Sequence, residues 1–106
     1  MVEENIISIE KLKDIKSIEK ILKTLGNKRR LAIIYFLGKI KQANVSDIAS
    51  EIKISLKATS KHLLQLFNFD IIEREQRGLE MWYKLSKNME NNKINDIIKY
   101  ISNSLE

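Results

Sequence analysis

A stretch near the middle of the chain combines basic and hydroxyl side chains at helical spacing. Lys57, Ser60, Lys61 and Leu64 follow one another at intervals of three, one and three residues. At about 100° per residue, they project from one face of a helix predicted over about 56–69. The opposite face of that helix carries Thr59, Leu63, Leu66 and Phe67. The basic face suits phosphate oxygens and guanine edges, and an ordinary solvated helix face is the alternative interpretation.

Five further residues suit the same chemistry. Ala58 flanks the basic face, and Ser46 and Ser55 begin predicted helices. We expect these serines to cap their helices, and a helix start can also bind phosphate through its backbone N–H groups, so the two roles are compatible. Arg74 and Arg77 flank the tip of a predicted hairpin. The negative potential of a DNA minor groove favours arginine at such a tip.

The chain lacks the side chains that most enzymes and metal sites need. It contains no Cys, a single His and no glycine-rich phosphate loop. The lone His62 excludes a His-dense metal site, and packing under its helix is the simplest role for it. We therefore expect no catalytic residue, no metal site and no cofactor.

The composition favours one mainly helical domain. The 106 residues fit a single domain, predicted over 1–106, and the three Gly and absent Pro disfavour a loop-rich β fold. No apolar run approaches the roughly 20 residues of a membrane span. Glu3 and Glu4 are unlike the basic start of a secretory signal. We expect a soluble, cytoplasmic protein without a membrane partner.

The basic excess lies in the middle of the chain. Lys and Arg number 19 against 14 acidic residues, which gives a net charge of +5. Residues 27–55 carry six basic and two acidic residues, a net charge of +4, whereas residues 1–26 carry five of each. A basic balance admits nucleic acid as a partner, and this distribution argues against a disordered basic arm.

Hydrophobic periodicity predicts five helices and one hairpin. Helical spacing of apolar residues favours helices over about 8–25, 28–37, 44–52, 56–69 and 88–105. Gly26 and Asn27 suit a left-handed end to the first helix. Between the last two helices the period changes to two, which predicts a hairpin over about 71–85 with its turn at Gln76-Arg77-Gly78.

This order of elements matches a winged helix-turn-helix. Two helices joined by a tight break, over about 45–69, form the helix-turn-helix, in which the second helix is the one that reads DNA. The hairpin that follows is the wing. The predicted fold is therefore mainly α (α+β), with the order α-α-α-α-β-β-α and one additional helix at each terminus.

Three stretches between Leu25 and Leu85 resemble the ArsR-type family of winged-helix repressors. They are LGNKRRLAII (25–34), SKHLLQL (60–66) and the segment 78–85 that ends in Tyr-Lys-Leu. The resemblance implies a homodimeric transcriptional regulator that releases DNA when an effector binds. It also implies that His62 supports the phosphate contact of the recognition helix.

The chain departs from this family at several positions. Asn44-Val45-Ser46-Asp47 stands where metal-sensing members often have C-V-C-D, and the last helix has no His. Metal sensing at either familiar site is therefore not expected. Lys53 and Asp70 stand at two positions that usually hold Gly. Asp tolerates left-handed backbone geometry better than Lys does.

Apolar stripes on the two terminal helices predict a dimer interface. Their three–four spacing is that of a helix-pair seam, and completion of one monomer's core is the alternative. The interface residues predicted are Leu12, Ile15, Ile18, Leu22, Ile94, Ile97, Ile98 and Ile101. We expect Trp82, on the outer face of the hairpin, to pack on the last helix or at this interface; a ligand or base platform is the alternative.

Three functions are compatible with these patterns. The leading hypothesis is a dimeric transcriptional regulator, a repressor, that reads double-stranded DNA and responds to an unidentified small-molecule or protein effector. The alternatives are an architectural DNA-binding protein with weak sequence preference and a winged-helix module that binds proteins. The modest net charge argues against the second function, and the basic face of the 56–69 helix argues against the third.

Overall fold

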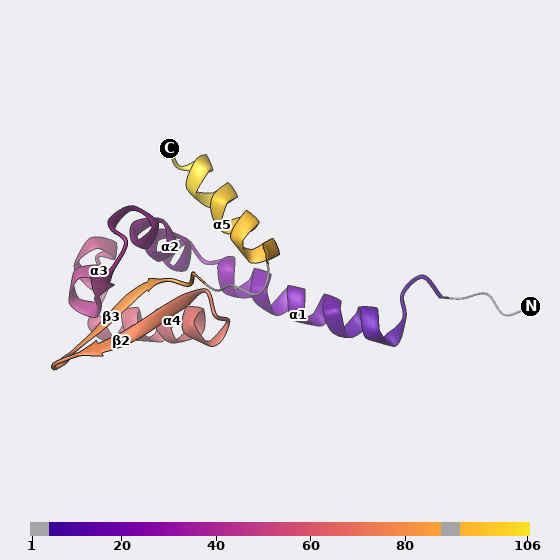
Figure 1. Ribbon diagram of the computed structural model, residues 1–106, viewed down its shortest axis with the longest axis horizontal. Helices are drawn as coiled ribbons and strands as arrows, with labels where there is room; N and C mark the ends of the chain where they lie inside the picture. The colour runs from indigo at the N-terminus through magenta and orange to yellow at the C-terminus, as the bar shows by residue number, and fades with distance from the viewer. Residues whose placement is uncertain (1–4, 88–91) are drawn as a thin grey trace, which may run out of the picture.

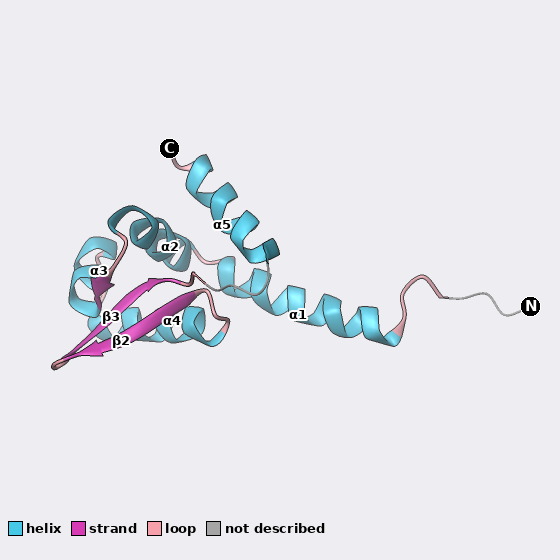
Figure 2. Cartoon of the chain, in the orientation of Figure 1, coloured by secondary structure: helices cyan, strands magenta, loops and turns pink. Residues whose placement is uncertain are grey.

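The computed structural model describes residues 5–87 and 92–106. Within them it contains five helices and one three-stranded sheet (Figures 1 and 2). In chain order these are α1 (Ile9–Leu25), α2 (Lys28–Ile40), β1 (Ala43–Asn44), α3 (Val45–Ile52), α4 (Leu56–Asn68), β2 (Ile72–Arg77), β3 (Glu80–Leu85) and α5 (Asn92–Ser104). The mixed α+β winged-helix fold is confirmed, with β1 as an element that the sequence did not predict. Residues 88–91 of the last predicted helix lie outside the described residues.

Four of the helices begin at a side chain that accepts a backbone N–H. The caps are Ser8 for α1, Asn27 for α2, Asn44 for α3 and Ser55 for α4. Two predictions are corrected here. Neither Gly26 nor Asn27 is left-handed: Gly26 ends α1 with φ −75°, and Asn27 has extended geometry and begins α2. Ser46 lies inside the first turn of α3 rather than capping it.

The sheet has the strand order β1-β3-β2 and is antiparallel throughout. The pair Arg77–Glu80 closes the hairpin, so its turn is Gly78-Leu79 rather than the predicted Gln76-Arg77-Gly78. Gly78 has φ +60°, and Leu79 is not among the residues with positive φ. This is the type II′ arrangement, which matches the twist of the strands and needs Gly at the first turn position.

The core joins α2, α3, α4, the base of the wing and α5. Its fully buried side chains include Ile33, Ile34, Leu37, Ile48, Leu63, Leu66, Ile71 and Ile72. Ile98 of α5 belongs to the same cluster, and Ile97 packs against it. The α5 stripe therefore contributes to the core of its own protomer.

Two tight turns position α4 and the wing. Lys53 ends α3 in left-handed geometry, with φ 64° and ψ 47°, and Asp70 has φ 58° before β2. The two positions at which the resembling family usually has Gly therefore both adopt positive φ in this chain. The break between α3 and α4 keeps the geometry of a helix-turn-helix although a lysine occupies it.

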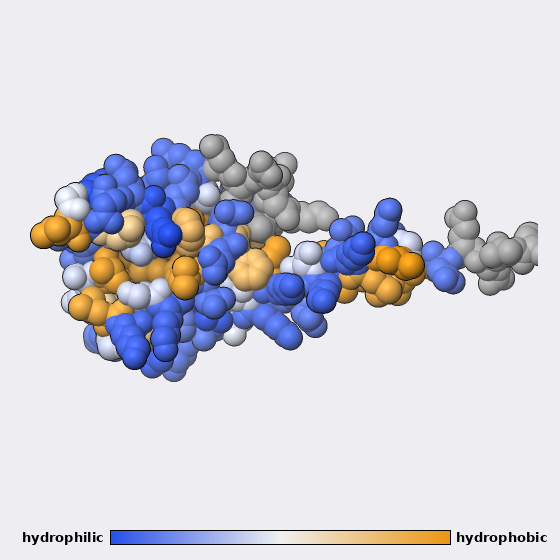
Figure 3. Space-filling model, turned by 90° about the horizontal axis from the view of Figure 1, so that it is seen from below, coloured by the Kyte–Doolittle hydropathy of each residue, from blue (hydrophilic) through white to orange (hydrophobic). Residues whose placement is uncertain are grey.

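The first helix projects from this body as an arm. The principal extents are 64 × 30 × 24 Å, and α1 runs along the long axis (Figure 1). Leu12, Ile15, Ile18 and Leu22 are about half exposed, at 46–55%, and hydrophobic surface gathers on the arm in Figure 3. In the described part of the chain, no helix is long and apolar enough to cross a membrane.

Candidate nucleic-acid interface

The exposed face of α4 carries the predicted basic residues. Lys57, Ser60 and Lys61 are all exposed, as is Leu64. Thr59, Leu63 and Leu66 on the opposite face have no exposed surface and fix the rotation of the helix. Neither lysine takes part in an ion pair among residues 5–87 and 92–106. The face therefore presents two cations, one helical turn apart, to the solvent.

The start of α4 places further donors beside this face. The Ser55 hydroxyl accepts the Ala58 N–H at 3.1 Å, and the Ser55 carbonyl accepts the buried Thr59 hydroxyl at 2.8 Å. Ala58 is half-buried, and Ser46 is exposed in the first turn of α3. Capping of α4 by Ser55 is thus confirmed, and the first two N–H groups of α4 have no acceptor within the helix.

His62 connects α4 to the end of α1 through Arg30. Its Nδ1 lies 3.2 Å from Arg30 Nη1, and Arg30 also donates to the carbonyl of Thr24. Because guanidinium groups only donate, Nδ1 accepts and the ring is neutral with its proton on Nε2. Desolvation of the half-buried ring, reinforced by the charges of Arg30 and Arg29, lowers the pKa of His62.

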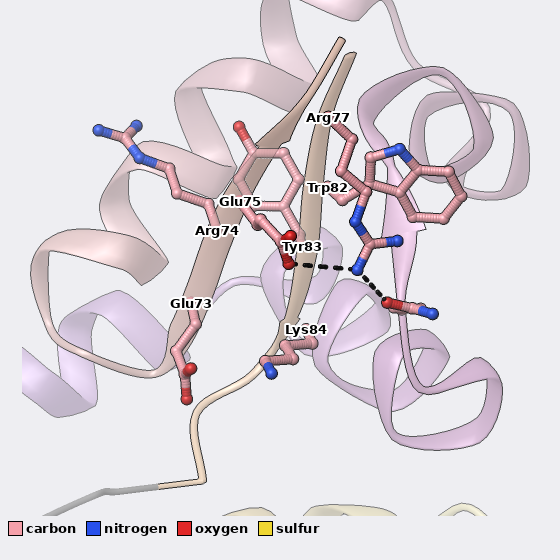
Figure 4. Close-up of a pocket in the computed structure, with 8 residues that line it drawn as sticks. Glu73, Arg74, Glu75, Arg77, Trp82, Tyr83 and Lys84 are labelled. Carbon is pink, nitrogen blue, oxygen red and sulfur yellow. Dashed lines mark hydrogen bonds and ion pairs between the residues drawn. The ribbon is translucent and has the colours of Figure 1, made fainter.

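The wing holds its two arginines differently (Figure 4). Arg74 stacks over the ring of Phe67 with its guanidinium carbon 4.0 Å from the ring centre, and its tip points away from the hairpin. Arg77 donates to Gln42 at 2.8 Å and to Glu75 at 3.2 Å. Within residues 5–87 and 92–106, Arg74 makes no side-chain hydrogen bond or ion pair, whereas part of the Arg77 fork is already used within the protomer.

Trp82 lies beside Arg77 in a small hollow of about 230 Å³ on the wing. The guanidinium carbon of Arg77 is 4.9 Å from the centre of its ring. Glu73 lines the same hollow and accepts the Lys87 N–H at 2.8 Å, which lowers the pKa of its carboxyl group. The residues that surround Trp82 in this hollow come from the wing and from the loop before β1.

Comparison with known proteins identifies the family. The model of the arsR family of bacterial regulatory proteins matches residues 27–74. The transcriptional repressor PagR of Bacillus anthracis is 31% identical over 83 residues, which cover 78% of this chain and 79% of PagR. The chain belongs to the ArsR family. Members of this family are winged-helix, DNA-binding regulators of transcription.

Solved structures show the same fold as this ArsR-family chain. NolR from Sinorhizobium fredii superimposes with a TM-score of 0.80 at 22% identity, covering 95% of this chain and 96% of NolR. The winged helix-turn-helix domain of Mb0332 from Mycobacterium bovis, which is described as homodimeric, gives 0.76 at 20% identity, covering 99% and 90%. At these identities the likeness establishes the fold.

The residues that the sequence predicts to contact DNA lie in three places in this ArsR-family structure. These are α4 with its N-terminal cap, the first turn of α3, and the wing. Two long-range hydrogen bonds of these residues were not predicted. Arg30 holds His62 from a position 32 residues earlier in the chain, and Gln42 holds Arg77 from the loop before β1. The sequence indicated that Arg30 has a partner, because a cation at the start of a helix is unfavourable without one. Nothing in the sequence indicated the contact of Gln42.

The position where metal-sensing relatives often have C-V-C-D carries different chemistry here. Asn44 is the cap of α3 and also donates to Glu80 at 3.1 Å, while Ser46 and Asp47 are exposed. Over the described ranges 5–87 and 92–106, no group of three or more His, Cys, Asp or Glu side chains could hold a metal ion. The start of α3 thus offers caps and hydroxyl groups.

Proposed function

We propose that this ArsR-family chain is a homodimeric transcriptional repressor that works in the cytoplasm as a single domain. In this proposal α4 enters the major groove and the wing flanks it. The DNA contacts are assigned to Ser46, Ser55, Lys57, Ala58, Ser60, Lys61, His62, Arg74 and Arg77. The signal that releases DNA is not a metal at the familiar sites of the family.

The observation that carries the proposal is the free basic face of α4. Lys57 and Lys61 are exposed, adjacent along the helix and without an ion-pair partner in the part of the chain that the structure describes. Lysines placed this way by the second helix of a helix-turn-helix reach phosphates and guanine edges. A helix face whose lysines served only solubility would be expected to carry acids as well.

The His62–Arg30 contact supports a positioning role for the histidine. With Nδ1 accepting from Arg30, the Nε2–H is the donor that the half-buried ring still has to offer. A neutral donor at this position suits a phosphate oxygen. Arg74 has a comparable free donor set on the wing, while Arg77 must exchange its bonds to Gln42 and Glu75 before it can reach a groove.

Dimerisation through α1 supports the symmetry of the proposed DNA site. Exposed apolar side chains at Leu12, Ile15, Ile18 and Leu22 line one stripe of the projecting helix, which is the pattern of an unfilled helix-pair seam. The homodimeric Mycobacterium bovis domain has the same fold. Two copies related by a two-fold axis present two α4 helices to half-sites about one DNA turn apart.

The first test is selection of random duplex DNA by the purified protein, with sequencing of the bound pool. We expect enrichment of a two-fold symmetric motif. A bound but unenriched pool would show a weakly selective architectural protein instead, and an empty pool would indicate a protein-binding module.

The second test measures how salt affects affinity for the selected DNA. Each of Lys57→Ala and Lys61→Ala should weaken binding and make the slope of log K against log salt shallower by about 0.9 for each lost phosphate contact, which is about 1.8 for a dimer that loses one contact per protomer. Lys99→Ala, an exposed lysine on α5, is the matched control and should leave the slope unchanged. Parent-like binding by both α4 variants would place the interface elsewhere.

A further inference from the structure

An open hollow of about 800 Å³ is lined by α2, the end of α3 and Leu105, and by no residue of the wing. Its walls are the exposed side of α2, the turn that joins α3 to α4, and Leu105 near the C-terminus. The chain end at α5 lies over this side of the body in Figure 1. The volume falls within the roughly 300–1,000 Å³ of small-molecule sites.

The floor of the hollow is apolar and aromatic. Ala32, Tyr35 and Phe36 contribute from α2, Ile52 from the end of α3, and Ile54 from the turn after it. Phe36 and Ile52 also pack against the core, so this floor is anchored to the rigid body of the protein. A surface of this kind accepts a flat aromatic ring or a short aliphatic chain.

The rim of the hollow is cationic. Lys28, Arg29, Lys39 and Lys53 line it together with the acid Glu51, and Lys39 is paired with Glu106. Lys28 and Arg29 occupy the first turn of α2, the end of a helix where cations are unfavourable and anions are stabilised. An anion at this rim would relieve that repulsion.

The chain's own C-terminal residues place an apolar side chain and a carboxylate at one edge of the hollow. Leu105 contributes its apolar side chain to the lining, and the carboxylate of Glu106 pairs with Lys39. Lys39 in turn lies over the Tyr35 ring, 5.6 Å from its centre. An apolar group next to a carboxylate is thus the chemistry that this edge accommodates.

We propose that the hollow binds an amphipathic organic anion, a carboxylate or sulfonate carried on an aromatic or short aliphatic body. The anion pairs with the rim lysines and Arg29, and its body covers Tyr35 and Phe36. The hollow is bounded on one side by the turn between α3 and α4, which positions α4, and on another by Leu105 just past the end of α5. Its occupation therefore changes the affinity for DNA, a consequence that rests on the function proposed above.

The test uses two aromatic probes of matched shape with the full-length protein. The anionic probe is 8-anilinonaphthalene-1-sulfonate, and N-phenyl-1-naphthylamine is its neutral counterpart. We expect the anion to bind at least tenfold more tightly than the neutral probe and decanoate to displace it. Equal binding of both probes would overturn the proposal, because the cationic rim would then have no role.

Variants of the rim show whether the probe binds in the hollow, because the exposed stripe of α1 can also bind apolar dyes. Lys39→Gln combined with Lys53→Gln should weaken binding of the anion at least tenfold. Lys99→Gln, outside the hollow, should not. Circular dichroism checks that each variant is folded, and unchanged binding by the double variant would overturn the assignment.

DNA titrations show whether the hollow is a ligand site or part of the DNA interface. Decanoate should shift the affinity of the parent for its selected DNA at least threefold and leave that of the double variant unchanged. If the double variant weakens DNA binding while probe affinity stays constant, the rim belongs to the DNA interface and the proposal fails. If probe binding persists but no DNA is bound at all, the site stands and the proposed function fails.

Discussion

At the scale of single residues, His62 makes stability depend on pH. Its Nδ1 accepts from Arg30, and its pKa is lowered from 6.5 by desolvation and by the neighbouring guanidinium charges. A lowered pKa means that the unfolded chain binds the proton more tightly, so the stabilising contribution is present above pH 6.5 and is lost as pH falls through the folded-state pKa. We expect Tm to fall between pH 7.5 and 5.5.

The variant His62→Gln tests the cause of this fall. An amide oxygen still accepts from Arg30 and does not titrate, so the Tm of the variant should vary less with pH over the same window. The carboxyl group of Glu73 has a pKa below its ordinary 4.5 and stays charged throughout. An equally steep dependence in the variant would remove His62 as the source.

The sequence predicted which residues face outward better than it predicted which residues they contact. Helical periodicity alone places Lys57 and Lys61 opposite the buried Leu63, because rotation along a helix is a local property. The partner of His62 lies 32 residues away and depends on how α2 crosses α4. Contacts of this kind follow from packing, which no local pattern encodes.

At the scale of elements, the hairpin turn requires a glycine at Gly78 on conformational grounds. Its φ is +60°, and no atom lies within 4 Å of the position that a Cβ would take, so the cost of a substitution is conformational and not steric crowding. Gly78→Ala should lower the free energy of unfolding by about 1–3 kcal/mol, the cost of holding a residue with a Cβ in a sparsely populated backbone region. Urea denaturation measures this loss.

The neighbouring turn residue provides the control for this prediction. Leu79 is fully exposed and lacks positive φ, so Leu79→Ala should change the free energy of unfolding by less than about 0.5 kcal/mol. Similar losses for the two variants would argue against the type II′ turn. Weaker DNA binding by Gly78→Ala would add evidence that the wing contacts DNA.

The elements that sequence reasoning missed or misplaced are short ones. The two-residue strand β1 is defined only by its pairing with Tyr83 and Trp82, far away in the chain. The hairpin turn begins two residues later than predicted, because strand register depends on cross-strand packing as well as on the position of a glycine. The left-handed Lys53 shows that the packing of α3 against α4 outweighs a local preference of about 1–2 kcal/mol.

At the scale of the whole molecule, α1 exposes more apolar surface than an isolated protomer should. Ile21, Thr24 and Leu25 connect its C-terminal end to the body, while the stripe from Leu12 to Leu22 faces solvent. Ile98 is already buried in the protomer and has little surface left for a partner. A second copy is therefore expected to pair mainly through α1, with Ile97 and Ile101 of α5 at the margin; the Ile94 side chain lies outside the described part of the structure.

The mass of the protein in solution tests this arrangement. The parent chain of 12.4 kDa should sediment as a dimer. Ile15→Glu puts a charge in the stripe and should raise the dimer dissociation constant at least tenfold, because a carboxylate desolvated in an apolar seam has no partner there. Ser17→Glu adds the same charge on the opposite face of α1, where the residue is exposed, and should stay dimeric.

The Ile15→Glu monomer should also lose cooperative binding to the two-fold DNA site while keeping the salt slope of a single half-site. A monomeric parent, or a dimer that Ile15→Glu does not weaken, would show that the arm serves another partner.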